Sequence, residues 1–184
     1  MDSLRQAAAE LSIPERTLKR AAAEGLIRGE RISPRRFRVN FREETYLRSH
    51  WGLLHTLRAT LRTEPNVRLA VLFGSTANGD DCEDSDIDVL VVLADPSVGR
   101  LVGLTERLSA RLGRDLQLVR LADAEKAPVL MADVIEQGRV LVDREERWRG
   151  LQEAMGKWRR LARRVENAAL AGPLGDLELD HRLA

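Results

Sequence analysis

Two apolar segments joined by a short polar and acidic stretch constrain the fold of this 184-residue chain most strongly. Residues 67–73 and 87–93 are rich in β-branched and aromatic side chains, which favour strands. The stretch between them begins with Gly74-Ser75 and leads into Asp86-Ile87-Asp88. Strand-like and helical patterns alternate over the rest of the chain, so we expect an α/β (α+β) fold. The expected elements are a helix from residue 42 that stops before Pro65, strands 67–73, 87–93, 116–121 and 140–142, and helices 98–112, 124–137 and 145–170.

The composition is that of a globular chain and excludes several classes of protein. Hydrophobic residues make up 43% and charged residues 32% of the chain, and the net charge is +1, so neither a disordered nor a strongly basic or acidic protein fits. Cys82 is the only cysteine, which excludes an intramolecular disulfide. The first residues lack the apolar core of a signal peptide, and no apolar run approaches the ~18 residues of a membrane span. We therefore expect a cytoplasmic protein with no membrane partner.

Two short helices and a hairpin are expected in the amino-terminal part. Helix 3–10 precedes a second helix, which begins with a capping box of Ser12 and Glu15 and ends before Gly25. Residues 26–40 alternate apolar and polar side chains, which predicts a hairpin. The basic residues of this segment are Arg28, Arg31, Arg35, Arg36 and Arg38.

Asp86 and Asp88 form a candidate metal site. Because successive side chains of a strand alternate between its faces, residues two apart leave the same face. Two carboxylates held so closely repel each other, a cost that a divalent cation removes, and Mg²⁺ prefers one or two carboxylates together with phosphate oxygens. Gly74 and Ser75 follow a strand and open a helical turn, where backbone N–H groups and a hydroxyl can hold a phosphate. The pattern therefore predicts a site for phosphoryl transfer.

Gly74-Ser75, ten further residues and then Asp86-Ile87-Asp88 resemble the G-S-x10-D-x-D signature of the minimal nucleotidyltransferases in the DNA polymerase beta superfamily. The segments VLFGS and DSDIDVLVVL resemble the first two strands of that family, and ADVIEQGRVLVD resembles the segment that closes its domain. The resemblance implies a polymerase-beta-like sheet with flanking helices. It also implies transfer of a nucleoside monophosphate from an NTP, with ATP as the expected donor and Mg²⁺ or Mn²⁺ as cofactor. Relatives of this size are often antitoxins that modify a partner toxin, which implies a protein acceptor.

The same resemblance assigns roles to individual residues and shows two departures from the family. The residues it assigns to metal and phosphate are Asp86, Asp88, Gly74 and Ser75. Many relatives carry an arginine where this chain has Asn78. The usual third carboxylate of the site aligns with Gln117, a neutral amide. Asp115 lies two residues earlier on the same strand face and is therefore the candidate third catalytic carboxylate.

Residues 3–47 resemble excisionase-like or MerR-like winged helix-turn-helix domains, in which the second helix enters the major groove and the wing contacts the DNA backbone. The resemblance implies DNA binding with phosphate contacts from the wing. The residues it assigns to DNA are Arg16, Thr17, Lys19 and Arg20 on the second helix and Arg35, Arg36 and Arg38 on the wing. The alternative is a small recognition or dimerisation module whose arginines are merely solvated.

The sequence thus divides into a winged helix-turn-helix at 1–47, a minimal nucleotidyltransferase domain at 48–143, and a carboxy-terminal helix and tail at 144–184. The first 50 residues are the basic part, with 11 Lys/Arg and 7 Asp/Glu. The first hypothesis is a metal-dependent nucleotidyltransferase coupled to DNA binding. The second is a DNA-binding transcriptional regulator whose transferase fold has lost catalysis, and the third is a structural protein that binds neither NTP nor DNA.

Other polar residues near the motif have ordinary explanations. Charge runs are usually solvated. The residues expected to form an inert acidic turn are Asp80, Asp81, Glu83 and Asp84. Cys82 has no histidine close to it in sequence, so we expect an incidental surface thiol. His50 and His55 miss the i, i+4 spacing of a helical metal pair and are expected to be ordinary helix residues.

Overall fold

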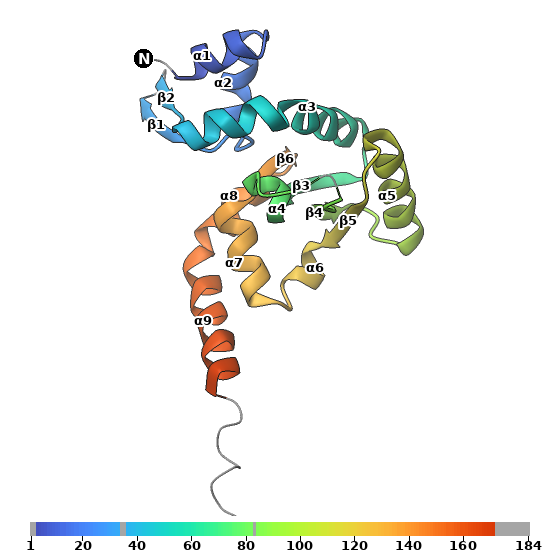
Figure 1. Cartoon of the computed structure of the whole chain (residues 1–184). Coiled ribbons are helices and arrows are strands. Elements are labelled where there is room, and N and C mark those ends of the chain that lie inside the picture. Colours follow the sequence, from blue (N-terminus) through green and yellow to red (C-terminus); the bar gives the residue numbers. More distant parts are fainter. Residues whose placement is uncertain (1–2, 34–35, 83, 172–184) are drawn as a thin grey trace, which may run out of the picture.

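A mixed four-stranded sheet lies at the centre of the protein in the computed structural model, which describes residues 3–33, 36–82 and 84–171 (Figure 1). Its strands, in the order β5-β4-β3-β6, are β5 (Leu116–Arg120), β4 (Ile87–Leu93), β3 (Val67–Phe73) and β6 (Arg139–Asp143). β3 is antiparallel to both β4 and β6, whereas β5 runs parallel to β4. The sequence predicted each of these strands to within one residue.

Helices cover both faces of the sheet (Figure 1). Side chains of β4 alternate between two cores, because this strand is buried on both sides. Ile87 and Val89 join the core on the side of α3 (Phe41–Thr63) and α5 (Val98–Leu112). Leu90 joins the core on the side of α7 (Pro128–Gln137) and α9 (Met155–Ala171). The predicted α+β architecture with flanking helices is therefore confirmed.

The amino-terminal part forms the predicted helices and hairpin, but not the predicted capping box. These elements are α1 (Ser3–Glu10), α2 (Glu15–Ala23), β1 (Glu30–Ser33) and β2 (Arg36–Arg38), with β1 and β2 antiparallel. Ser12 has φ 54°, and the N–H of Ile13 donates to Ala8 O at 3.0 Å. Ser12 thus takes the left-handed position that ends α1, so it cannot cap α2, whose N-cap is Pro14. Gly25, with φ 81°, ends α2 as predicted.

Two of the predicted later helices differ in the structure. The helix expected at 124–137 begins only at Pro128, as α7, because Pro128 disfavours a helical conformation at Ala127, and a separate short helix, α6 (Leu121–Ala124), precedes it. The helix expected at 145–170 is split into α8 (Arg147–Glu153) and α9 at Ala154, which has ψ 0°. Val165, predicted on the packed face with Trp158, is 47% exposed.

The amino-terminal part and the sheet share one core. α3 runs without a break through residues 47–48, where the sequence placed a domain limit. Leu26, Leu47 and Leu72 belong to the same cluster of buried side chains. In the part of the chain that the structure describes, none of the helices has the length and hydropathy needed to cross a membrane.

A buried ion pair joins the amino-terminal part to the sheet. Arg139 on β6 is 1% exposed and Glu43 on α3 is 5% exposed. The guanidinium donates to both carboxylate oxygens of Glu43, at 2.5 and 2.9 Å. It also donates to Ala77 O at 2.7 Å and Leu26 O at 3.3 Å, and it lies 3.6 Å from the ring centroid of Tyr46. Arg139 therefore connects β6, α3, the segment after α2 and the turn that follows β3.

Glu43→Gln should lower the free energy of unfolding by about 3 kcal/mol or more, because it leaves the charge of Arg139 buried without its partner. Glu153→Gln is the matched control, since the Arg149–Glu153 pair is exposed on α8 and such pairs contribute about 0–1 kcal/mol. Urea unfolding at neutral pH measures both variants. Equal losses in the two variants would contradict a central role for the buried pair.

Candidate active site

The end of β3 and the start of β4 bring Gly74 and Asp88 together. Phe73 pairs with Asp88 in the antiparallel register, so Asp88 lies beside the first residue after β3. Gly74 has φ 73°, a left-handed conformation that favours glycine. A Cβ atom at this position would lie 2.6 Å from Oδ2 of Asp88. The fold therefore requires glycine here, and the Asp88 carboxylate reaches the bare backbone at the start of α4 (Gly74–Asn78).

Asp86 and Asp88 are electrostatically coupled carboxylates. Asp86 directly precedes β4 and is exposed, whereas Asp88 is half-buried. Burial raises the pKa of the Asp88 carboxyl above its ordinary value, and the negative charge of Asp86 raises it further. The pair thus carries a repulsion that a divalent cation would relieve, and its oxygen donors suit Mg²⁺ or Mn²⁺.

β5 lies beside this pair, and the candidate third carboxylate, Asp115, directly precedes this strand. The parallel register places Gln117 opposite Asp88, and the N–H of Ile87 donates to Asp115 O at 2.9 Å. Asp115 and Gln117 are both exposed, and Gln117 shares the sheet face of Asp88. Within residues 3–33, 36–82 and 84–171, no three His, Cys, Asp or Glu side chains gather closely enough to hold a metal ion. The catalytic role of Asp115 therefore stays a prediction.

Hydrogen bonds fix the α4 turn relative to the acidic pair. The carbonyl of Ser75 accepts the N–H of Gly79 at 2.9 Å. Thr76 donates its hydroxyl to Asp86 O at 3.4 Å, and Tyr46 of α3 donates its hydroxyl to Thr76 O at 3.1 Å. The Gly74-Ser75 segment and the Asp86-Ile87-Asp88 segment are thus linked through α4, and Tyr46 of α3 supports this link.

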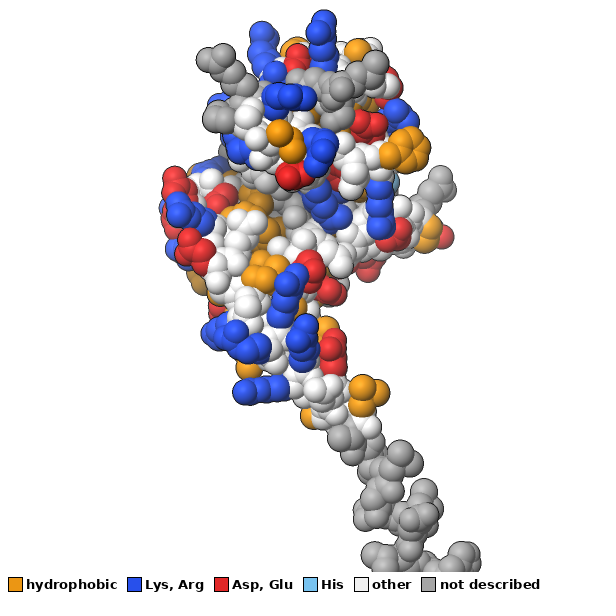
Figure 2. All heavy atoms as spheres, turned by 90° about the vertical axis from the view of Figure 1, so that its left-hand side faces the viewer, with side chains coloured by type: hydrophobic (Ala, Val, Ile, Leu, Met, Phe, Trp, Pro, Cys, Tyr) orange, Lys and Arg blue, Asp and Glu red, His pale blue; other side chains and the backbone are white. Residues whose placement is uncertain are grey.

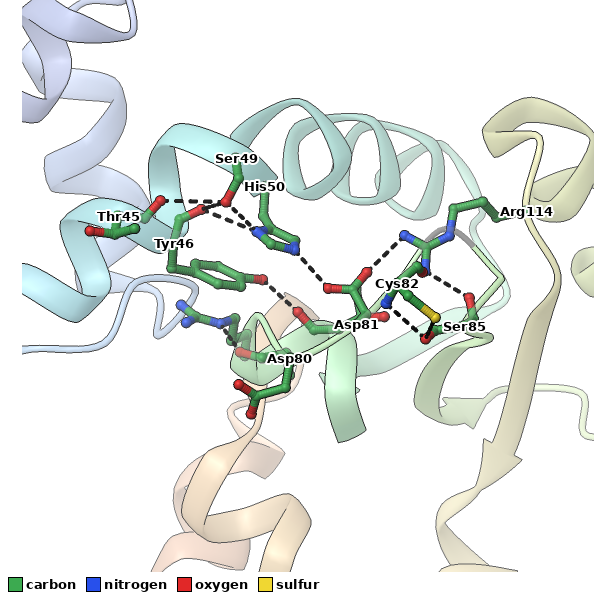
Figure 3. A network of polar contacts seen from close by, with 12 residues as sticks. Thr45, Tyr46, Ser49, His50, Asp80, Asp81, Cys82, Ser85 and Arg114 are labelled. Carbon is green, nitrogen blue, oxygen red and sulfur yellow. Dashed lines mark hydrogen bonds and ion pairs between the residues drawn. The ribbon is translucent and has the colours of Figure 1, made fainter.

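Asp81 is not part of a solvated turn, which corrects the prediction made from its charge run. Its side chain is 5% exposed and lies between His50 and Arg114 (Figure 3). Nε2 of His50 is 2.8 Å from Oδ1, and Nη1 of Arg114 is 2.9 Å from Oδ2. Burial alone would raise the pKa of Asp81, but its hydrogen bonds with His50 and Arg114 outweigh burial and hold the pKa below its ordinary value. Asp81 is therefore a buried structural carboxylate.

This network holds the loop that leads into Asp86. Arg114 donates to Ser85 O at 2.7 Å and to Cys82 O at 3.3 Å. Cys82 is exposed as predicted, and a hydrogen bond with the Ser85 hydroxyl lowers the pKa of its thiol. The other members of the predicted acidic turn are Asp80 and Asp84, which are exposed, and Glu83, which lies outside the described residues.

His50 is more than an ordinary helix residue, contrary to the prediction. Its ring stacks on Tyr46 with centroids 4.4 Å apart, and Nδ1 lies 2.8 Å from the Ser49 hydroxyl (Figure 3). Its partner Asp81 is 31 positions away in sequence, so no spacing rule could have joined them. His55 lies on the exposed side of α3, with its ring tilted toward Trp51.

A guanidinium from the amino-terminal part contacts Asn78, the position where the family resemblance led us to expect an arginine. Nη1 of Arg28 donates to Oδ1 of Asn78 at 3.0 Å, and the Asn78 amide donates to Oε1 of Gln137 at 2.6 Å. Burial, followed by repulsion from Arg139, lowers the pKa of Arg28 to about 10. A positive charge therefore stands at the end of α4, but it comes from a distant position that the motif alone did not indicate.

The residues assigned to DNA lie on the surface of the amino-terminal part. The exposed ones are Arg16, Lys19, Arg20, Arg36 and Arg38, while Thr17 is half-buried and Arg35 lies outside the described residues. Three of them form ion pairs within the chain: Lys19 with Glu15 at 2.6 Å, Arg20 with Glu24 at 3.3 Å and Arg38 with Glu30 at 2.5 Å. Figure 2 shows basic side chains over the amino-terminal part at the top of the view and along α9 below it.

Comparisons with known proteins agree with this geometry. The family model described as polymerase beta, nucleotidyltransferase matches residues 55–147. No curated protein matches the sequence significantly. A chain of the crystal structure of a toxin-antitoxin with AMP-PNP is similar, with a TM-score of 0.50 and 27% identity, over 64% of this chain and 93% of that chain. A chain of a mutant toxin-antitoxin MntA-HpeT is also similar, with a TM-score of 0.51 and 25% identity, over 64% of this chain and 93% of that chain.

The segment that matches the family model contains the whole candidate site. It includes Gly74-Ser75 at the start of α4, Asp86-Ile87-Asp88 at the start of β4, and all four strands of the central sheet. It extends over half of the chain. The chain therefore belongs to the polymerase beta nucleotidyltransferase family.

Proposed function

We propose that the protein is a metal-dependent nucleotidyltransferase that moves a nucleoside monophosphate from an NTP, with ATP as donor, to a hydroxyl of a protein acceptor and releases pyrophosphate. The observation that carries this proposal is the approach of the Asp88 carboxylate to the bare backbone of Gly74, beside the second carboxylate of Asp86. This geometry fits a phosphate-bound metal ion between the two halves of the motif. Family membership and the toxin-antitoxin neighbours support the same reaction class.

Each residue of the site has a distinct part in this proposal. Asp86 and Asp88 hold Mg²⁺ or Mn²⁺, which when bound neutralises charge on the phosphates during the transfer. The backbone N–H groups after Gly74 and the hydroxyl of Ser75 orient phosphate oxygens. Asp115, which directly precedes β5, would take the proton of the attacking hydroxyl, with a water or the acceptor bridging the distance between them.

A partner toxin is the protein acceptor that we propose. One neighbour is described as a toxin-antitoxin with AMP-PNP, an adenine nucleotide, and this chain matches 93% of its length. The second neighbour is likewise a toxin-antitoxin. By this likeness the protein would act as an antitoxin that modifies its toxin with a nucleoside monophosphate.

Asp88→Asn should weaken the affinity for Mg²⁺-ATP more than about tenfold, because the amide is a poorer metal ligand than a carboxylate. The affinity of the wild type should also fall as the pH is lowered, because protonation of the raised-pKa Asp88 competes with the metal. Isothermal titration calorimetry measures both effects.

Asp84→Asn in the exposed part of the same loop is the matched control and should leave the affinity unchanged. Without metal, Asp88→Asn should not destabilise the fold, since the raised pKa shows that folding disfavours the charged form. Equal affinities in the two variants would show that Asp88 does not hold the metal.

Gln117 lies opposite Asp88 on β5, and we expect this position to limit the rate of the transfer. If Gln117 stands where a base is needed, Gln117→Asp should raise metal-dependent label transfer from α-labelled ATP by about tenfold or more, the usual scale of general acid–base contributions. If Asp115 has taken over that role, Asp115→Asn should abolish transfer. The acceptor in this assay is the proposed partner toxin. Strong transfer that responds to neither change would show that β5 holds no base.

DNA binding by the amino-terminal part is a second proposed function. The observation that favours it is the β1–β2 hairpin, which follows α2 in the chain and contacts α1, with exposed arginines on the hairpin and on α2. If catalysis were absent, the protein would act as a DNA-binding transcriptional regulator built on a transferase fold. Both functions are compatible in one chain, because the hairpin and the acidic pair lie in different elements.

Arg36→Ala on the hairpin should make the salt dependence of duplex binding shallower by about 0.9 in the log–log slope, the value for one phosphate contact. Arg100→Ala on α5, where the arginine pairs with Asp95, is the matched control and should leave the slope unchanged. Fluorescence anisotropy across a salt series measures this slope. Failure to retain any duplex from a random-sequence pool at low salt would rule out DNA binding.

A further inference from the structure

A hollow with a basic rim lies between α2 and α3, outside the candidate active site. It has a volume of about 530 Å³ and an apolar floor that includes Leu26 and Trp51. The arginines that line it are Arg16 and Arg20 from α2 and Arg58 and Arg62 from α3. Leu26 and Trp51 belong to the core on the α3 side of the sheet. Asp88 lies on the other face of the sheet, because it shares the strand face of Leu90, which joins the opposite core. The hollow and the acidic pair are therefore separate features.

Positive charge exceeds negative charge in this hollow. Glu24 is the carboxylate that its arginines share: Arg58 pairs with it closely, Arg20 lies 3.3 Å from it and Arg62 lies 3.8 Å from it. Arg16 adds a fourth guanidinium to the rim. One carboxylate thus faces several cations, and a second anion would reduce their mutual repulsion.

Arg58 shows this imbalance most clearly. Its side chain is 12% exposed, and its buried Nε has no hydrogen-bond partner among the described residues. Burial, followed by the charges of Arg62 and Arg20, lowers the pKa of Arg58 to about 10. A buried donor without an acceptor is costly, and a buried guanidinium needs charge compensation beyond a shared carboxylate.

We propose that the hollow between α2 and α3 binds a phosphate group, with Arg16, Arg20, Arg58 and Arg62 as its donors. Guanidinium groups bind phosphate through paired N–H donors, and several of them converge here on one concave surface. The phosphate comes either from a free phosphate compound or from the backbone of a nucleic acid. Binding at this site needs no divalent metal and does not depend on the proposed transfer reaction.

The test uses the full-length protein in the presence of EDTA, so that metal-dependent binding at Asp86 and Asp88 makes no contribution. The two probes are inorganic tripolyphosphate, followed by calorimetry, and a short DNA duplex, followed by fluorescence anisotropy at fixed salt. Arg62→Gln should weaken the binding of at least one probe by about tenfold or more, the scale of a lost charge-assisted hydrogen bond. Arg100→Gln, on the exposed surface of α5, is the matched control and should change the affinity by less than about twofold.

A local readout separates this site from the general charge of the chain. The bound probe should shift the indole N–H resonance of Trp51, which lies at the floor, and leave those of Trp148 and Trp158 in place. Arg58→Lys should retain part of the affinity through its charge but lose the paired donors of the guanidinium. Arg62 is half-exposed, so Arg62→Gln remains informative if changes at Arg58 unfold the protein.

The outcomes assign the source of the phosphate or overturn the proposal. If Arg62→Gln loses the tripolyphosphate binding of the wild type, the natural ligand is a free phosphate compound. If the wild type binds no tripolyphosphate and Arg62→Gln loses duplex binding, the natural ligand is the backbone of a nucleic acid. The proposal is wrong if neither probe binds, if Arg62→Gln and Arg100→Gln behave alike, or if the Trp51 resonance does not move.

Discussion

The buried ion pair of Arg139 and Glu43 holds the amino-terminal part and the central sheet together. The bonds of Arg139 with Glu43 tie β6 to α3, and its bonds with Ala77 O and Leu26 O tie both to the turn after β3 and to the segment after α2. A charge buried this deeply is tolerated only when its donors are satisfied. The position of the α4 turn, and with it the phosphate-binding end of the proposed site, is thereby fixed by a residue far from the motif.

The candidate site is held from two sides by side chains that take no part in the proposed chemistry. α3 supports it through the Tyr46 hydroxyl and through His50, which contacts the buried Asp81. The segment before β5 supports it through Arg114, which contacts Asp81 and the loop that leads into Asp86. α3 is therefore part of the transferase scaffold, and it also connects this scaffold to the basic amino-terminal part.

Much of the site follows from local sequence, because strand alternation and the glycine requirement act over a few residues. The placement of Asp86 beside Asp88 follows from the period of a strand. The family resemblance indicated Gln117, but only the register of the folded sheet shows that it lies opposite Asp88. The contact of Asp81 with His50 joins positions 31 apart, so only the folded chain reveals it. Ser12 failed as a helix cap because it already ends α1, a competition between neighbouring elements that a motif of four residues does not show.

We propose that a metal-bound nucleotide lies between the end of β3 and the start of β4. Paramagnetic broadening of amide resonances by Mn²⁺, with a non-hydrolysable ATP analogue present, measures this position directly. We expect selective broadening at Gly74, Ser75, Asp88 and Gln117, with little effect on α1 or α9. Broadening that is uniform along the chain, or centred on the amino-terminal part, would contradict the proposed site.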